Sequence, residues 1–238
     1  HIFSSNYELY GDISTRIMSL LSTFCADIEI YSIDEAFLDL TNVTSLVKTG
    51  FNIKQEVWRQ QRMPVCVGIA PTKTLAKLAN HLAKKSKKLS GVCIIDNITE
   101  WENVFKRILV SKVWGVGNRL SSRLKLWDIE TVYDLIKQPP KRIRKEFGVT
   151  LERTVRELNG EKCFDIETQP PPKKEILCSR SFGEKVTALS SLKESVATYT
   201  NRASKKLRRQ NGLTQRISVM IQTSRFHQNR YINSASLK

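Results

Sequence analysis

Four short apolar runs, each bounded by polar or turn-forming residues, predict the strands of the N-terminal part of the chain. Two of them, 28–33 and 36–40, are separated only by a pair of acidic residues, as in a bent hairpin. The other two lie at 63–69 and 92–96. Gly68 in the third run permits a close backbone approach, which is typical of a strand packed under a helix.

Apolar residues at helical spacing predict three helices around these strands. The first follows Asp12, which can cap it, the second covers 47–61, and the third begins near Pro71. Strands and helices in this order favour a mixed sheet with helices on one face. The positions expected to face the core are Ile13, Ile17, Leu20, Leu21, Phe24, Phe51, Ile53, Val57, Trp58, Leu75, Leu78, Ala79 and Leu82.

The third helix also carries lysines outside its apolar stripe. These are Lys73, Lys77, Lys84 and Lys85. A lysine-rich helix face is most often simply solvated, so spacing alone does not assign these residues a ligand.

From Trp101 onward the pattern is helical with short loops. The segment 112–120 reads K-V-W-G-V-G-N-R-L, and D-I-E-T-V-Y-D-L follows at 128–135. This is the pattern of a helix-hairpin-helix, in which glycines expose backbone N–H groups and a helix N-terminus to a DNA phosphate. A glycine-cornered turn without a ligand is the alternative.

A proline-rich break at 169–174 ends the helical region and predicts a stiff connection. Beyond it the pattern predicts a strand at 176–187, an amphipathic helix at 192–209, a strand at 214–223 and a further strand at 231–238. This order of elements indicates a second, smaller α/β region.

Composition excludes several classes. Of the 238 residues, 40% are hydrophobic, but no apolar run is long enough for a membrane span and no signal-peptide pattern opens the chain. The five cysteines are scattered without a CxxC pair, so neither a zinc site nor a disulfide framework is expected. A reducing cytoplasm is the expected location.

Charge is distributed unevenly along the chain. The net charge is +16, yet residues 1–70 hold 5 basic and 8 acidic residues, and no acidic residue follows Glu194. A net positive charge of this size indicates a polyanionic partner, either nucleic acid or an anionic membrane surface. A solvated basic surface without a partner is the alternative.

The acidic pair Asp34-Glu35 is the candidate for chemistry. Neighbouring side chains on a straight strand point to opposite faces, but at a bend between two strands both carboxylates converge. Mg²⁺ prefers such oxygen ligands together with substrate phosphates. The alternative is an ordinary acidic turn, which is common in proteins.

The string Y-S-I-D-E-A-F-L-D at 31–39 resembles the second metal-binding motif of the Y-family lesion-bypass DNA polymerases. The surrounding chain is most similar to UmuC-type catalytic subunits of bacterial DNA polymerase V. The resemblance implies a multidomain α+β fold: the end of the fingers and the palm at 1–98, and an all-α helix-hairpin-helix thumb at 99–166. A connection at 167–175 and an incomplete α/β little finger at 176–238 would follow.

The same resemblance implies the site. Asp34 and Glu35 would bind two Mg²⁺ ions with a further carboxylate upstream of His1, where the fingers' nucleotide contacts and steric gate would also lie. Asp39 is expected to be structural. Lys84 would hold the incoming triphosphate, with Lys85 as the alternative. The implied DNA contacts are Lys77, Lys112, Gly115, Gly117, Asn118, Arg119, Arg180 and Ser181.

The function implied is error-prone translesion synthesis on a DNA primer-template, with dNTP as substrate, in SOS damage tolerance. The implied location is the bacterial cytoplasm, in association with the nucleoid. A UmuD-type dimer, the recombinase filament and the sliding clamp are the partners that the resemblance implies. Two alternatives remain at this level: a DNA-binding fragment without catalysis, and a basic protein that binds RNA or a membrane surface.

Overall fold

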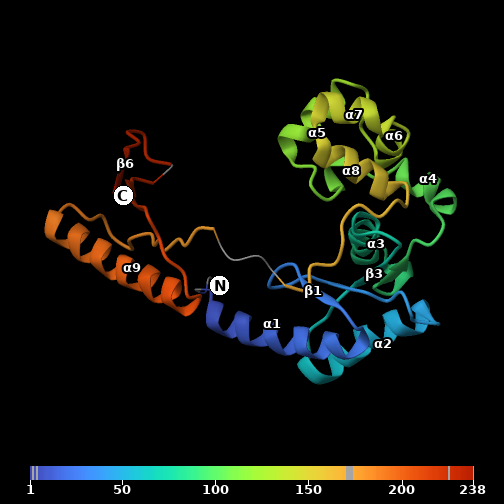
Figure 1. The fold of residues 1–238 in the computed structure, drawn as a ribbon, viewed down its shortest axis with the longest axis horizontal. Coiled ribbons are helices and arrows are strands. Elements are labelled where there is room, and N and C mark those ends of the chain that lie inside the picture. The colour runs from blue at the N-terminus through green and yellow to red at the C-terminus, as the bar shows by residue number, and fades with distance from the viewer. Residues whose placement is uncertain (2, 4, 170–173, 225, 238) are drawn as a thin grey trace. The chain divides into compact units, whose positions relative to one another are not determined.

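Two compact units make up the chain, His1–Pro170 and Pro171–Lys238. The computed structural model describes all residues except 2, 4, 170–173, 225 and 238 (Figure 1). Both units contain helices and short strands, so the predicted α+β class is confirmed. Within the described residues, no helix has the length and apolar character needed to cross a membrane.

The first helix, α1 (Tyr7–Leu21), begins earlier than the sequence predicts. Its N-cap is Asn6, whose side-chain oxygen accepts the Leu9 N–H at 3.1 Å. The predicted cap Asp12 lies inside the helix and pairs with Arg16 at 2.7 Å, so that prediction is wrong. Asparagine is as good an N-cap as aspartate, and the helix begins at the earlier of the two residues, Asn6, which adds a further turn.

A β-hairpin follows, formed by β1 (Ile28–Ile30) and β2 (Ala36–Leu38). The strands are antiparallel, and the pair Ile30↔Ala36 closes a loop of residues 31–35, which we call the acidic loop. The predicted bend between the two runs is therefore confirmed.

Helix α2 (Leu46–Gln61) ends where Arg62 adopts a left-handed conformation. Its Ile53 and Val57 are buried as predicted. Phe51 and Trp58, expected in the core, are 38% and 50% exposed. Residues 53 and 57 lie four apart and already supply the stripe that packs inward, which leaves the two aromatic residues at its margins.

A β-α-β unit is built from β3 (Val67–Ile69), α3 (Lys73–Lys85) and β4 (Val92–Ile94). The strands pair in parallel, which requires the helical crossover between them. A Cβ on Gly68 would lie 2.2 Å from the Asn80 backbone nitrogen, so only glycine lets α3 pack this closely. Within the described residues the antiparallel and parallel pairs are two separate sheets, not the single mixed sheet predicted.

The helical part of the first compact unit begins with a 3₁₀ turn and continues through short helices (green and yellow in Figure 1). Thr131 and Asp134 form a capping box at the start of one of them, α6. The elements are η3 (Ile98–Trp101), α4 (Glu102–Phe105), η4 (Val110–Lys112), α5 (Asn118–Lys125), α6 (Val132–Ile136), α7 (Pro140–Phe147) and α8 (Val149–Leu158).

One buried apolar cluster joins the β-α-β unit to these helices. It runs from Leu75 and Leu78 of α3 through Phe105 to Val155 and Leu158 of α8. The expected division at 98/99 therefore falls inside one compact unit. A continuous core fixes the segments on either side of that division relative to each other.

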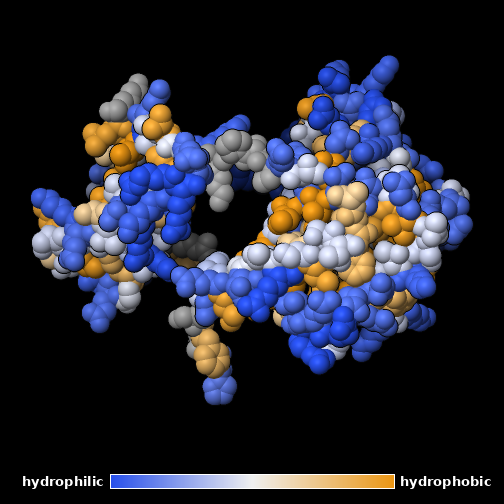
Figure 2. All heavy atoms as spheres, turned by 60° about the horizontal axis from the view of Figure 1, so that its bottom comes forward, coloured by the Kyte–Doolittle hydropathy of each residue, from blue (hydrophilic) through white to orange (hydrophobic). Residues whose placement is uncertain are grey.

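The second unit contains α9 (Leu189–Arg209) and an antiparallel pair, β5 (Ile217–Gln222) and β6 (Ile232–Leu237). The predicted strand at 176–187 is wrong, because these residues form no ladder with any described segment. An apolar alternation becomes a strand only when another strand receives its backbone hydrogen bonds. Figure 2 shows largely hydrophilic side chains on the visible surface, with apolar patches among them.

Candidate active site

The acidic loop brings Asp34 and Glu35 to the tip of the β1–β2 hairpin. The Glu35 carbonyl accepts the N–H groups of Tyr31 and Ser32 at 3.1 and 3.0 Å, which tightens the loop. The Ser32 hydroxyl donates to Asp34 Oδ1 at 2.5 Å. Asp34 is exposed and Glu35 half-buried, so both carboxylates remain within reach of a ligand.

Glu35 already has one cationic neighbour. Lys77 Nζ, from the second turn of α3, lies 2.9 Å from Glu35 Oε2. The Lys77 ammonium also lies 4.4 Å from the centre of the Tyr31 ring, which is a cation–π distance. The side chain is only 20% exposed. Lys77 therefore meets the acidic loop within the fold, although the sequence predicts it as a DNA contact.

The donor set of the acidic loop fits a hard divalent cation. Two carboxylates supply oxygen ligands, and Mg²⁺ commonly takes the rest of its shell from water and substrate phosphate. Lys77 offsets part of the negative charge of this pair in the structure. Among the described residues, no group of three or more His, Cys, Asp or Glu side chains is arranged to hold a metal ion.

Another acidic residue, Asp39, directly follows β2 and is hydrogen-bonded by nearby Thr41. Asp39 Oδ1 accepts the Thr41 N–H at 2.9 Å and the Thr41 hydroxyl. These hydrogen bonds from Thr41 lower the pKa of Asp39. The expected structural role of Asp39 agrees with this closed local turn.

The buried pair Lys73–Glu29 was missed by sequence reasoning. Lys73, expected on a solvated face, is 8% exposed and bonds Glu29 Oε2, so that expectation is wrong. The same oxygen accepts the Glu167 N–H at 2.7 Å. A sequence signal existed: Glu29 stands between two isoleucines of a strand, where a charge needs a partner.

The C-terminal turn of α3 and η4 together form a cluster of positive charge, which we call the basic cluster: His81, Lys84, Lys85 and Lys112. Lys84, Lys85 and Lys112 are exposed, and His81 is half-buried between them. Burial first, and then the positive charges of Lys112, Lys85 and Lys84, lower the pKa of His81. Lys84, the predicted triphosphate ligand, and Lys112, a predicted DNA contact, therefore both lie close enough to His81 to lower its pKa.

Residues 112–119, where a helix-hairpin-helix turn is predicted, connect η4 to α5, and we call them the glycine hairpin. Gly115 has a φ of +83°, and Gly117 is extended directly before α5. Both glycines, Asn118 and Arg119 are exposed, so the start of α5 is open to solvent.

Trp114 of the glycine hairpin reaches the acidic loop. Its indole N–H donates to the Tyr31 hydroxyl at 3.1 Å. Sequence motifs alone did not indicate this contact, because it joins residues 83 positions apart. Arg180 and Ser181, the remaining predicted contacts, are exposed in the second unit, outside any helix or strand.

Two family models match the chain. The model described as the impB/mucB/samB family covers residues 1–81, and the model of that family's C-terminal domain covers residues 173–238. The chain belongs to the impB/mucB/samB family. The resemblance on which the site residues were predicted is thereby confirmed at the level of the family.

Similar proteins refine the position within the impB/mucB/samB family. The chain is 47% identical over 241 residues to the protein UmuC of Salmonella typhimurium, and 42% identical over 242 residues to the protein MucB of Escherichia coli. The alignments cover 99% and 100% of this chain but only 57% and 58% of those relatives, so the chain spans little more than half their length.

A solved structure, described as a Y-family DNA polymerase chimera of Dbh and Dpo4 segments, matches with a TM-score of 0.71. It is 26% identical, and the match covers 98% of this chain and 65% of that chain. With the relatives above, this likeness identifies a UmuC-type member of the Y-family polymerases.

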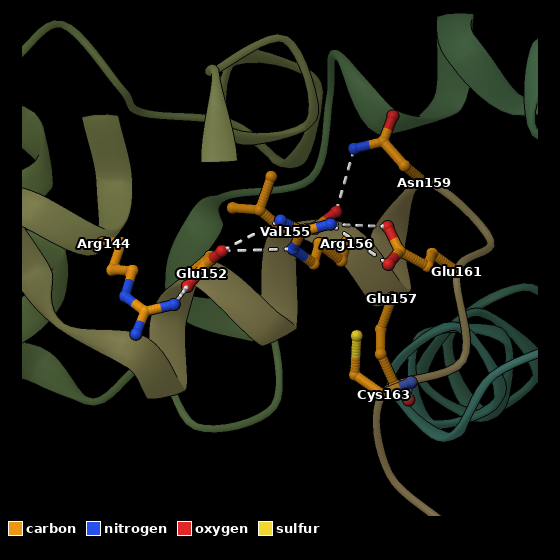
Figure 3. A network of polar contacts seen from close by, with 8 residues as sticks. All are labelled: Arg144, Glu152, Val155, Arg156, Glu157, Asn159, Glu161 and Cys163. Atoms are coloured by element: carbon orange, nitrogen blue, oxygen red, sulfur yellow. Dashed lines mark hydrogen bonds and ion pairs between the residues drawn. The ribbon is translucent and has the colours of Figure 1, made fainter. Parts of the chain in front are cut away.

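This impB/mucB/samB member has a further feature that was not predicted, a network of ion pairs on α7 and α8. Figure 3 shows Glu152, which is buried, between Arg144 at 3.3 Å and Arg156 at 3.0 Å, with Glu161 on the far side of Arg156. Acidic and basic residues alternate here, so no charge run marks it in the sequence. A pocket of about 360 Å³ is lined by Arg144, Val149, Glu152, Arg153, Arg156 and Cys163.

Proposed function

We propose that this chain is the catalytic portion of a DNA polymerase that adds nucleotides to a primer 3′ end opposite damaged template bases. The acidic loop carries the proposal: Asp34 and Glu35 stand together at a hairpin tip, in the same unit as the basic cluster and the glycine hairpin. The family and the likeness to Y-family polymerases support it.

In this proposal residues 1–98 serve as the end of the fingers and the palm, and 99–166 as the thumb. Residues 167–175 connect them to the little finger at 176–238. The acidic loop supplies the catalytic carboxylates and the glycine hairpin supplies the grip on DNA. The compact first unit supports the functional pairing of palm and thumb, because their shared core holds both segments together.

Asp34 and Glu35 would hold Mg²⁺, two ions in the family mechanism. Bound there, Mg²⁺ would promote loss of the primer hydroxyl proton and offset charge on the phosphates. The residues themselves have separate tasks: the two carboxylates orient the reacting groups, and Lys84 binds the triphosphate with its exposed ammonium. Lys85, exposed beside it, is the alternative for that task.

DNA contacts are proposed on both units. In the first unit the N–H groups at the start of α5 and the nearby cations would bind backbone phosphates without reading bases. Arg180 and Ser181 would bind template phosphate from the second unit. The proposed contacts of the first unit are Lys112, Gly115, Gly117, Asn118 and Arg119, with Lys77 assigned to the acidic loop instead.

DNA binding is expected to weaken steeply with salt. Each phosphate neutralised by a cationic group releases counterions, so the logarithm of the association constant should fall linearly with the logarithm of the salt concentration. Replacing Lys112 or Arg119 by glutamine should lower this slope by about one each. Fluorescence anisotropy with a labelled primer-template measures the slope.

Lys48→Gln serves as the matched control, because Lys48 is equally exposed but lies on α2 outside the proposed DNA contacts. It should leave the slope unchanged. A flat salt response of the unmodified protein would overturn the proposed DNA-binding role.

Binding of primer-template is expected to raise the pKa of His81. Burial, and then the charges of Lys112, Lys85 and Lys84, now lower this pKa, and bound phosphates would offset those charges. A proton is then taken up on binding, so affinity should strengthen as pH falls through this pKa. Nitrogen NMR titration of His81 with and without DNA measures the change, and a pKa that stays or falls would contradict the prediction.

The alternative of a DNA-binding fragment without catalysis shares the salt and His81 predictions and differs only in primer extension. The observations do not favour it, because the two carboxylates of the acidic loop stand together and Lys77 pairs with Glu35 beside them. The UmuD-type dimer, recombinase filament and sliding clamp stay predictions from the family resemblance.

A further inference from the structure

The ammonium of Lys77 is enclosed by groups from two functional segments. The acidic loop contributes the Glu35 carboxylate at 2.9 Å and the Tyr31 ring at 4.4 Å. The glycine hairpin contributes the Trp114 ring, whose centre lies 5.5 Å from Nζ. A single charge therefore interacts with the proposed metal ligand and with the proposed DNA grip at once.

Trp114 is fixed at this place by its own contacts. Its indole N–H bonds the Tyr31 hydroxyl, and the two rings meet edge to face at 5.5 Å. Phe37 of β2 and Phe164, which follows α8, complete the cluster at 5.7 Å each. The ring lies directly before Gly115, so a displacement of the glycine hairpin carries it along.

We propose that Lys77 and Trp114 are positioning residues that couple the glycine hairpin to Glu35. A divalent cation that draws the Glu35 carboxylate from Lys77 changes the place of the ammonium over the Trp114 ring. Conversely, duplex binding that moves the glycine hairpin changes how strongly Lys77 holds Glu35. Coupling of this kind is reciprocal: DNA raises affinity for the cation by the same factor by which the cation raises affinity for DNA.

This inference rests on the proposed function and takes its first test from spectroscopy. Protein expressed from the complete gene is labelled with 5-fluorotryptophan, and the Trp114 fluorine signal is assigned by its loss in Trp114→Phe. Titration with Mg²⁺ alone is expected to shift this signal. The shift should vanish in Lys77→Met and persist in Lys77→Arg, which keeps the cation over the rings.

Trp127 provides the matched control signal. It also has a cation over its ring, Arg142 at 4.7 Å, but the ring packs against Phe147 and, among the described residues, not against the acidic loop. It should not respond to Mg²⁺. A Trp114 signal that stays fixed during the titration, or that still shifts in Lys77→Met, would overturn the proposal.

The second test compares Mg²⁺ affinity with and without primer-template, read from the same signal. Unmodified protein should bind Mg²⁺ about fivefold or more tightly on DNA, within the usual range for coupled sites. Tyr31→Phe, which removes only the hydroxyl that accepts the Trp114 N–H, should reduce this factor. Lys106→Met, a lysine over Tyr133 at 4.8 Å, should leave it unchanged.

The coupling and the proposed active site can be disproved separately. If primer extension requires Asp34 but the Trp114 signal ignores Mg²⁺, the coupling is wrong and the proposed function stands. If extension survives loss of both carboxylates, the proposed active site is itself wrong.

Discussion

Asp34→Ala or Glu35→Ala is expected to lower Mg²⁺-dependent primer extension by at least about 10²-fold, the scale on which one charge-stabilising group acts. Both side chains stand at the hairpin tip, where their oxygens are the hard ligands that Mg²⁺ prefers. In the absence of Mg²⁺, DNA affinity should change little, because the acidic loop offers phosphates no positive charge. Single-turnover extension and anisotropy binding, on protein expressed from the complete gene, measure the two quantities separately.

Asp39→Ala is the matched control for this experiment. Asp39 belongs to the same hairpin, but its carboxylate is held by Thr41. Its loss should leave extension within a few-fold of the unmodified protein. Extension that survives both tip substitutions, or that falls equally in Asp39→Ala, would contradict the assignment of the ligands.

Glu157→Ala is expected to lower the free energy of unfolding by roughly 3 kcal/mol or more, the cost of orphaning several buried donors. Glu157, at the end of α8, is fully buried. Its Oε2 accepts the Thr74 N–H and hydroxyl at 2.9 and 2.8 Å, and its Oε1 accepts the N–H groups of Cys163 and Phe164 at 3.1 and 3.0 Å. Urea denaturation followed by circular dichroism measures the loss.

The neighbouring Glu161 supplies the comparison (Figure 3). Its carboxylate is 57% exposed and pairs with Arg156, so Glu161→Ala should cost below about 1 kcal/mol, as exposed ion pairs do. Equal losses of unfolding free energy in Glu157→Ala and Glu161→Ala would mean that the buried hydrogen bonds of Glu157 stabilise the fold no more than an exposed ion pair does.

The local features of the site were predictable because they depend on neighbours in sequence. Two apolar runs that flank Asp34-Glu35 define the hairpin, and the glycines of residues 115 and 117 define the turn before α5. The prediction of Lys73 on a solvated face was wrong because its partner Glu29 lies 44 residues away. Short-range periodicity carries no information about which distant carboxylate a buried lysine meets.

The strand expected at 176–187 illustrates the same limit in the other direction. Its residues have the composition of a strand, but a strand is defined by pairing, and within the described chain nothing pairs with it. The cap of α1 is a smaller case: both Asn6 and Asp12 suit the position, and the extra turn decides between them. Long-range pairing determined where the predictions of Lys73 and of the strand at 176–187 were wrong, whereas the error at the α1 cap was local.

The hydrogen bond between Glu29 Oε2 and the Glu167 N–H has a mechanical consequence. Glu167 lies at the end of the first unit, where the chain leaves toward the second, and Glu29 lies on β1, one residue before the end of that strand. Any change in the position of β1 at Glu29 is therefore transmitted directly to the backbone of Glu167. The C-terminal end of the first unit is thus anchored, through one carboxylate oxygen, to the strand that leads into the loop of Asp34 and Glu35.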